Sequence, residues 1–217
     1  GLAPARIEYL DAETAAILNA QDGATFAERP HLLLEFHGSE AAVAEEAARF
    51  GELAAEAGAG GYAWATAPED RTRLWTMRHR AYHTILASRP GSTAVVTDVC
   101  VPISLLGEAI DRAAADIAAS GLRGPILGHV GDGNYHAILL VNRDAPSELA
   151  TAKRLSDAMV EHALDLGGTA TGEHGVGFGK LHFMEREHGA AWDVMGAVKR
   201  ALDPDGVMNP GKMVRQN

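Results

Sequence analysis

Two histidines flank a glycine-rich turn in the middle of the chain. His129 and His136 stand on either side of Gly-Asp-Gly-Asn at residues 131–134, and strand-like apolar residues extend outward from both. A two-residue turn at Asp132 and Gly133 would place the histidines opposite each other, with Cβ atoms roughly 4.5–5.5 Å apart. Two imidazoles in this arrangement could bind one metal ion. The alternative is a pair of partly exposed strand histidines without a ligand.

A second polar group lies in a loop rich in glycine and threonine. Residues 169–177 read TATGEHGVG and set Glu173 and His174 among small residues that let backbone segments approach closely. Glu173 and the histidine pair would form a nitrogen and carboxylate set, which suits Zn²⁺, Mn²⁺ or Fe²⁺ better than Ca²⁺ or Mg²⁺. In the alternative interpretation, Glu173 caps a helix that begins near Phe178, and His174 only fills a turn.

One arginine falls on the apolar side of an expected helix. In residues 69–86 the helical period places Arg78 between Trp75 and Tyr82, on a stripe of apolar side chains. A guanidinium group is rarely buried without an anionic partner. The sequence therefore predicts a carboxylate beside Arg78, either an internal Asp or Glu or a bound carboxylic acid held in a bidentate pair.

Alternating strand and helix patterns are expected to position these residues. Strands are expected at residues 31–37, 62–67, 94–101, 125–130 and 135–141. Helices are expected at residues 40–57, 69–86, 104–119, 147–166 and, after the glycine-rich loop, up to 202, with Ser39 and Ser104 as N-caps. The pattern predicts one α+β domain over residues 1–217, with a ferredoxin-like antiparallel sheet and helices packed on one face.

Composition and charge exclude several classes of protein. The 217 residues include 19 Lys and Arg against 29 Asp and Glu, which gives a net charge of −10, and no basic cluster occurs. A nucleic-acid partner or an anionic membrane surface is therefore not expected. No apolar run approaches the roughly 20 residues that span a bilayer, and no G-x-G-x-x-G motif follows a strand. We expect a cytoplasmic protein without a transmembrane segment or a dinucleotide cradle of its own.

Five motifs occur in order along the chain. They are LWTMR at residues 74–78, TDVCVP at 97–102, GHVGDGNYH at 128–136, GEHGVG at 172–177 and DPDGVMNPGK at 203–212. In these motifs and their spacing, the sequence resembles the C-terminal domain of FAD-linked oxidases of the D-lactate dehydrogenase, glycolate oxidase and D-2-hydroxyglutarate dehydrogenase family. The resemblance covers nearly the whole chain, and the VCVP segment is most similar to the D-lactate dehydrogenase branch.

The resemblance implies a role for each candidate residue. Three residues match the positions that hold a divalent metal, with Zn²⁺ or Mn²⁺ expected: His129, His136 and Glu173. His174 matches the histidine that removes the hydroxyl proton of the substrate, and Arg78 matches the arginine that binds the substrate carboxylate. Asn209 matches a residue of the C-terminal tail that lies against the flavin. The implied reaction oxidises a small D-2-hydroxy acid, D-lactate or a glycolate-like acid, with hydride transfer to the flavin.

The resemblance also implies a partner. FAD is held mainly by an N-terminal FAD-binding domain, and no part of this sequence resembles that domain. The chain is therefore expected to bind substrate and metal, to be inactive alone, and to reach a membrane surface only through an electron acceptor, which the sequence does not identify. Two alternatives stay open on the residues alone. One is a stand-alone metal-dependent hydrolase whose three ligands activate water, and the other is a noncatalytic ferredoxin-like module.

Overall fold

A six-stranded antiparallel sheet forms the centre of the protein. The computed structural model describes residues 2–215, and its strands lie in the order β2-β1-β5-β6-β3, with β4 also paired to β6. Each of these pairings is antiparallel. The strands are β1 (Arg6–Leu10), β2 (His31–Glu35), β3 (Ser92–Val96), β4 (Val99–Cys100), β5 (Ile126–Gly128) and β6 (Asn134–Asn142).

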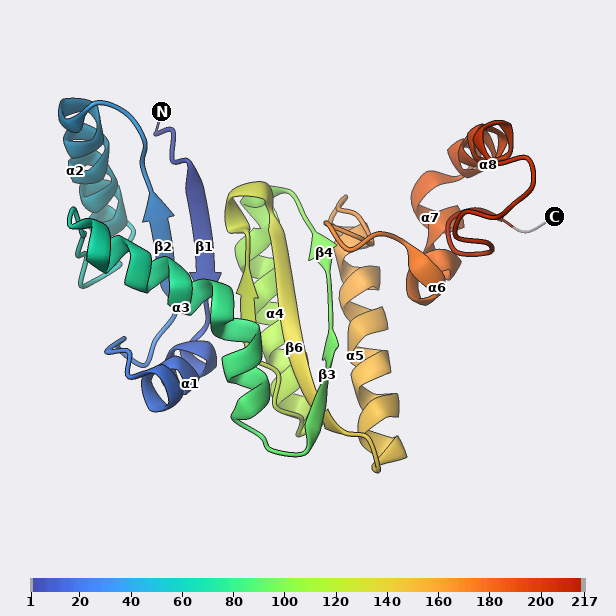
Figure 1. Cartoon of the computed structure of the whole chain (residues 1–217), viewed down its shortest axis with the longest axis horizontal. Helices are drawn as coiled ribbons and strands as arrows, with labels where there is room; N and C mark the ends of the chain where they lie inside the picture. Colours follow the sequence, from blue (N-terminus) through green and yellow to red (C-terminus); the bar gives the residue numbers. More distant parts are fainter. Residues whose placement is uncertain (1, 216–217) are drawn as a thin grey trace.

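Helices cover both faces of this sheet. Helices α1 (Ala12–Asp22) and α3 (Pro68–Ala87) pack on one face, and α4 (Leu106–Ser120) and α5 (Pro146–Asp165) pack on the other (Figure 1). Helix α2 (Glu40–Glu56) lies near β2 at one end of the molecule. The short C-terminal helices extend away from the sheet at the other end: α6 (Gly177–Lys180), α7 (Met184–His188) and α8 (Ala191–Leu202).

The burial of β6 explains why both faces are covered. All its residues from 134 to 141 are buried, and successive side chains point to opposite faces. Leu139 and Val141 join the core that contains α4 and α5, whereas Ile138 and Leu140 join the core that contains α1 and α3. The expected α+β class with an antiparallel sheet is confirmed. The helices lie on both faces rather than on one, because neither face of β6 is left to solvent.

The sequence pattern predicts no element before residue 31, yet β1 and α1 occupy this segment. Strand β1 lies inside the sheet, paired with β2 on one side and β5 on the other. Asp11 follows the strand and caps α1, because its carboxylate accepts a hydrogen bond from Thr14 N at 2.7 Å. The same carboxylate accepts a hydrogen bond from Ile126 N of β5 at 2.8 Å. This strand brings Glu8 into the centre of the molecule.

Two expected strands differ in the structure. Residues 62–67 are an exposed loop, in which the Tyr62 ring packs on Phe50 with centroids 5.5 Å apart. No strand of the described sheet lies beside them, so their alternating pattern finds no hydrogen-bonding partner. The run at 94–101 is interrupted at Thr97 and Asp98, between β3 and β4.

The two expected helix caps have different outcomes. Ser39 is confirmed as the N-cap of α2, since its hydroxyl accepts a hydrogen bond from Ala42 N at 3.3 Å. Ser104 is not a cap, because it lies inside a turn of 3₁₀ helix, Ile103–Leu105, that leads into α4.

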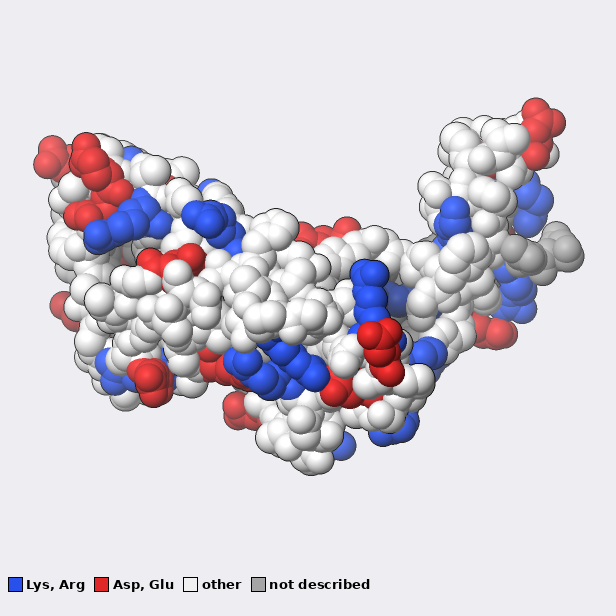
Figure 2. Space-filling model, turned by 60° about the horizontal axis from the view of Figure 1, so that its bottom comes forward, with Lys and Arg blue, Asp and Glu red and all other residues white. Residues whose placement is uncertain are grey.

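Seen from below, the molecule is elongated, and basic and acidic groups lie side by side on the visible face (Figure 2).

Candidate active site

The turn between β5 and β6 differs from the one that the sequence predicts. Strand pairing places Leu127, not His129, opposite His136. A turn of 3₁₀ helix, Val130–Asp132, fills the connection, and Gly133 follows with a φ of +79°. The shift of two residues preserves the face of the sheet, because side chains alternate with a period of two. The two imidazole rings therefore lie near each other, with centroids 5.9 Å apart.

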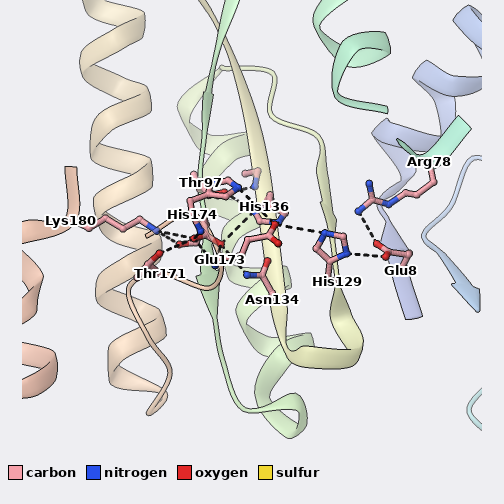
Figure 3. Close-up of polar contacts among 12 residues, drawn as sticks. Glu8, Arg78, Thr97, His129, Asn134, His136, Thr171, Glu173, His174 and Lys180 are labelled. Atoms are coloured by element: carbon pink, nitrogen blue, oxygen red, sulfur yellow. Dashed lines mark hydrogen bonds and ion pairs between the residues drawn. The ribbon is translucent and has the colours of Figure 1, made fainter. Parts of the chain in front are cut away.

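Both rings are held through their Nδ1 atoms. His129 Nδ1 lies 2.8 Å from Glu8 Oε1, and His136 Nδ1 lies 2.9 Å from the carbonyl oxygen of Thr97. Because both partners are acceptors, each Nδ1 is assigned the proton and each Nε2 keeps its lone pair. Glu173 Oε1 faces these lone pairs, 3.0 Å from His136 Nε2 and 3.7 Å from His129 Nε2 (Figure 3).

This arrangement fits a divalent metal. The ligand atoms of His129, His136 and Glu173 all lie within 4.8 Å of one another. Two nitrogen lone pairs and an anionic oxygen repel one another unless a cation lies between them. Burial lowers the pKa of His136, which disfavours a proton on that ring as the cation, whereas the hydrogen bond to Glu8 raises the pKa of His129. Outer acceptors on both Nδ1 atoms are the usual surroundings of metal-binding histidines.

Glu8 connects His129 to a buried arginine. Burial alone would raise the pKa of Glu8, but the hydrogen bond from His129 and the charge of Arg78 outweigh it and lower the pKa. The hydrogen bond to Glu8 in turn raises the pKa of His129. Glu8 is therefore an anion in the folded protein, and it makes His129 a more basic ligand.

Arg78 on α3 has an internal carboxylate partner, one of the two that its position predicts. Its Nη2 atom lies 2.7 Å from Glu8 Oε2, and the two side chains are 10% and 6% exposed. The Nε atom of Arg78 is buried without a hydrogen-bond partner among residues 2–215. A cavity of about 580 Å³ opens beside the pair, lined in part by Arg78 and His129. The substrate role of Arg78 stays a prediction, since the guanidinium is held by Glu8 and retains further donors.

A substitution of Arg78 that removes its charge is expected to lower stability more than one that keeps the charge. Arg78→Met leaves the buried Glu8 anion without its counter-charge and is expected to lower the free energy of unfolding by about 3–5 kcal/mol. Arg78→Lys keeps the charge but loses the planar fork, so it is expected to cost clearly less. Denaturant unfolding measures both values. Equal losses in the two variants would contradict a stabilising ion pair with Glu8.

His174 lies against His136 with its ring accessible. The two rings are stacked, with centroids 5.0 Å apart and planes inclined by 10°. The His174 side chain is 47% exposed, and its Nε2 atom is 3.8 Å from Glu173 Oε1. Its ring nitrogens make no hydrogen bond within the described part of the chain. An exposed imidazole whose ring nitrogens make no hydrogen bond is placed to accept a proton from a group that enters the site. The role of His174 as a base stays a prediction.

Glu173 does not cap a helix. Helix α6 begins at Gly177, its N-cap is Val176, and no side chain makes a capping hydrogen bond there. The Glu173 side chain instead points toward the two histidines (Figure 3). The structure thus favours the ligand interpretation of Glu173 over the capping alternative, although the metal itself stays a prediction.

Asp98 is a site residue that the sequence reasoning missed. It is 1% exposed, and its carboxylate accepts hydrogen bonds from the backbone N–H groups of Glu173 and His174. Burial alone would raise the pKa of Asp98, but hydrogen bonds from the His174 N–H and the Asn134 amide, with the charge of Lys180, lower it strongly. A charged residue inside the apolar run 94–101 is the signal that could have identified it.

Asn209 lies apart from the histidines, in the segment that follows α8. Its backbone has a φ of +46°, and its carbonyl oxygen accepts a hydrogen bond from Lys212 N at 3.3 Å. This C-terminal segment projects away from the sheet (Figure 1). The predicted contact of Asn209 with a flavin therefore stays a prediction.

Known proteins resemble this chain over nearly all its length. Residues 1–213 match the family described as "FAD linked oxidases, C-terminal domain". The chain is 40% identical over 215 residues to "Probable D-lactate dehydrogenase, mitochondrial" of Danio rerio, covering 99% of this chain and 43% of the relative. It is 30% identical over 219 residues to "Glycolate oxidase subunit GlcD" of Escherichia coli strain K12, covering 99% and 43%. The chain thus spans less than half the length of these relatives.

Solved structures share the fold at low sequence identity. The 4-ethylphenol oxidase from Gulosibacter chungangensis superposes with a TM-score of 0.66 at 12% identity, over 95% of this chain and 47% of that one. In the part of the chain that the structure describes, no helix is both long and apolar enough to cross a membrane. The family match over residues 1–213 and the relatives above show that the chain belongs to the family of FAD-linked oxidase C-terminal domains.

Proposed function

We propose that this chain is the substrate- and metal-binding part of an FAD-dependent D-2-hydroxy acid dehydrogenase that oxidises D-lactate or a glycolate-like acid. The observation that carries the proposal is the set of three electron-pair donors, His129 Nε2, His136 Nε2 and Glu173 Oε1, that face one another beside Arg78. The relatives named as a D-lactate dehydrogenase and a glycolate oxidase subunit support the substrate class. They also favour an oxidoreductase over a hydrolase or a noncatalytic module.

Each candidate residue has a defined task in this proposal. Bound Zn²⁺ or Mn²⁺ would polarise the hydroxyl oxygen of the acid, and the flavin would accept the C2 hydride. Arg78 would bind the substrate carboxylate with the donors that Glu8 leaves free. The exposed His174 ring would take the hydroxyl proton, and Asn209 would lie against the flavin.

The proposal requires an FAD-binding domain as the partner of this chain. The family is described as the C-terminal domain of FAD linked oxidases, and the chain covers 43% of its Danio rerio relative and 38% of "D-lactate dehydrogenase [cytochrome], mitochondrial" of Arabidopsis thaliana. In the proposal, the remaining part of such a protein holds FAD and faces the histidine cluster. Both relatives are named as mitochondrial, so the cytoplasmic location expected from the sequence stays a prediction.

Mn²⁺ binding to the 217-residue chain tests the proposal. We expect the chain to bind Mn²⁺, and we expect His136→Ala to abolish binding because it removes a ligand held by the sheet. Added D-lactate should change the electron paramagnetic resonance spectrum of the bound ion more than L-lactate does. His182→Ala is the matched control, since His182 is 52% exposed and lies outside the ligand set. Equal Mn²⁺ binding by the wild type and His136→Ala would contradict the proposed site.

A further inference from the structure

The interruption between β3 and β4 provides a hydrogen-bond acceptor for the ring of His136. The two strands keep one register against β6 on either side of the break. At the break, Ala137 N donates to the hydroxyl oxygen of Thr97 at 2.8 Å rather than to its backbone carbonyl. The carbonyl oxygen of Thr97 is therefore free to accept the Nδ1–H of His136. The break therefore helps to orient His136, a candidate metal ligand.

Asp98 follows Thr97 and holds the neighbouring loop. It is buried, and most of the groups that donate to it belong to residues 171–180. Its carboxylate oxygens accept hydrogen bonds from Glu173 N (3.1 Å), His174 N (2.9 Å), Asn134 Nδ2 (2.9 Å), Thr171 Oγ1 (3.0 Å) and Lys180 Nζ (3.5 Å). A single carboxylate therefore attaches this loop to the start of β6.

Gly172 shows how closely the loop passes over Asp98. A Cβ atom at this position would lie 2.8 Å from Asp98 Oδ1 and would overlap the side-chain amide of Asn134. Any residue other than glycine would have to displace either the loop or the side chains of Asn134 and Asp98. The backbone of the loop therefore packs directly against the Asp98 carboxylate.

Asp98 is not available as a metal ligand itself. Asp98, His136 and His174 do offer donor atoms that lie within 4.8 Å of one another. The oxygens of Asp98 are already occupied by the donors of the loop, however. The ring nitrogen of His136 that lies 3.7 Å from Asp98 is Nδ1, which donates to the Thr97 carbonyl. An effect of Asp98 on the placement of Glu173 and His174 must therefore pass through the loop.

We propose that Asp98 is a positioning residue that orients the loop of residues 171–174, so that Glu173 reaches the two histidines and His174 stacks on His136. The backbone N–H groups of Glu173 and His174 turn toward Asp98, and the Glu173 side chain extends from the loop toward His136 (Figure 3). The role assigned to Glu173 rests on the proposed metal site. The orientation of the loop does not.

Asp98→Asn tests this role in the 217-residue chain. The amide keeps the size of the side chain but removes the anion and turns an NH₂ donor toward other donors. In the metal-free protein, we expect the amide protons of Glu173 and His174 to lose protection from hydrogen exchange. We expect Zn²⁺ affinity to fall by about 10- to 100-fold, as for outer partners of metal ligands. The visible spectrum of bound Co²⁺ should shift toward that of Glu173→Gln.

Asp203→Asn is the matched control. Asp203 is 5% exposed, accepts hydrogen bonds from Val207 N and Met208 N at 2.9 Å each, and pairs with Lys199. It anchors a loop in the same manner as Asp98, but outside the histidine cluster. Its substitution should lower stability and leave Zn²⁺ affinity and the Co²⁺ spectrum unchanged.

Thr171→Val provides a milder variant if Asp98→Asn does not fold. It removes one donor to Asp98 and keeps the shape of the side chain, so smaller changes in the same direction are expected. Wild-type protection of Glu173 and His174 in the variants, or a change in Zn²⁺ affinity no larger than in Asp203→Asn, would overturn the positioning role. A wild-type chain without Zn²⁺ affinity would contradict the metal site instead, and the exchange of the two amide protons would then decide the inference alone.

Discussion

Replacing His174 by alanine is expected to slow flavin reduction by about 10²- to 10⁴-fold, the usual contribution of a general base. The His174 ring is stacked on His136 and is 47% exposed, so it is held in place and still open to a substrate hydroxyl. Metal content should stay at the wild-type level, because the three proposed ligands remain. Rapid-mixing measurements on a polypeptide that joins this chain to an FAD-binding domain give the rate, and metal analysis of the same sample gives the content.

His182→Ala controls for the loss of an exposed imidazole in the same part of the chain. His182 is 52% exposed and pairs only distantly with Asp157, at 4.0 Å, so the rate should not change. A His174→Ala variant that loses its metal while Glu173→Gln keeps it would show that the two neighbouring residues have the opposite roles. An unchanged rate in His174→Ala would remove this residue from the chemistry.

The approach of His129 and His136 could be predicted although their register could not. The turn signal Asp132-Gly133 indicated a hairpin, but a 3₁₀ turn replaced the two-residue turn and shifted the pairing by two residues. An error of two residues keeps every side chain on its face, whereas an error of one would have separated the rings. Local sequence therefore determined the face of the sheet, and the exact pairing depended on the fold of the turn.

The acidic partners of the site could not be identified in the same way. Arg78 on an apolar stripe predicts a carboxylate, but Glu8 lies 70 residues away on a strand outside the elements expected from the sequence. Glu8 and His129 are separated by 121 residues, and Asp98 and His174 by 76. Their contacts follow from the order of the strands in the sheet. That order depends on long-range strand pairing, which the local periodicity of the sequence does not predict.

Strand β1, in the segment before residue 31, also depends on contacts that the local sequence does not predict. Strand β1 alternates charged residues with Ile7 and Tyr9, and one of the charged residues, Glu8, is buried. This alternation is typical of a half-buried strand, but it predicts a solvent-exposed Glu8, so the pattern does not reveal that this charge is buried. The strand is stable in the sheet because Glu8 is paired with both Arg78 and His129.

Glu173→Gln is expected to weaken Zn²⁺ binding by more than the roughly 10- to 100-fold expected for an outer partner of a ligand. The carboxylate is the only anion of the proposed ligand set, and its Oε1 atom faces both Nε2 atoms. The Glu173 side chain is 50% exposed, so the fold should tolerate the amide. Calorimetric titration with Zn²⁺ measures the affinity, and thermal unfolding of the metal-free variant checks the fold.

Glu8→Gln is the comparison that separates a direct ligand from an outer partner. Glu8 contacts His129 Nδ1 on the side away from Glu173, so its loss makes the ring less basic but leaves all three donor atoms present. We therefore expect a smaller loss of Zn²⁺ affinity in Glu8→Gln than in Glu173→Gln, together with a larger loss of stability because the Arg78 pair is weakened. The reverse order of affinities would place the metal on the Glu8 side of His129, next to the cavity that Arg78 lines, and would remove Glu173 from the ligand set.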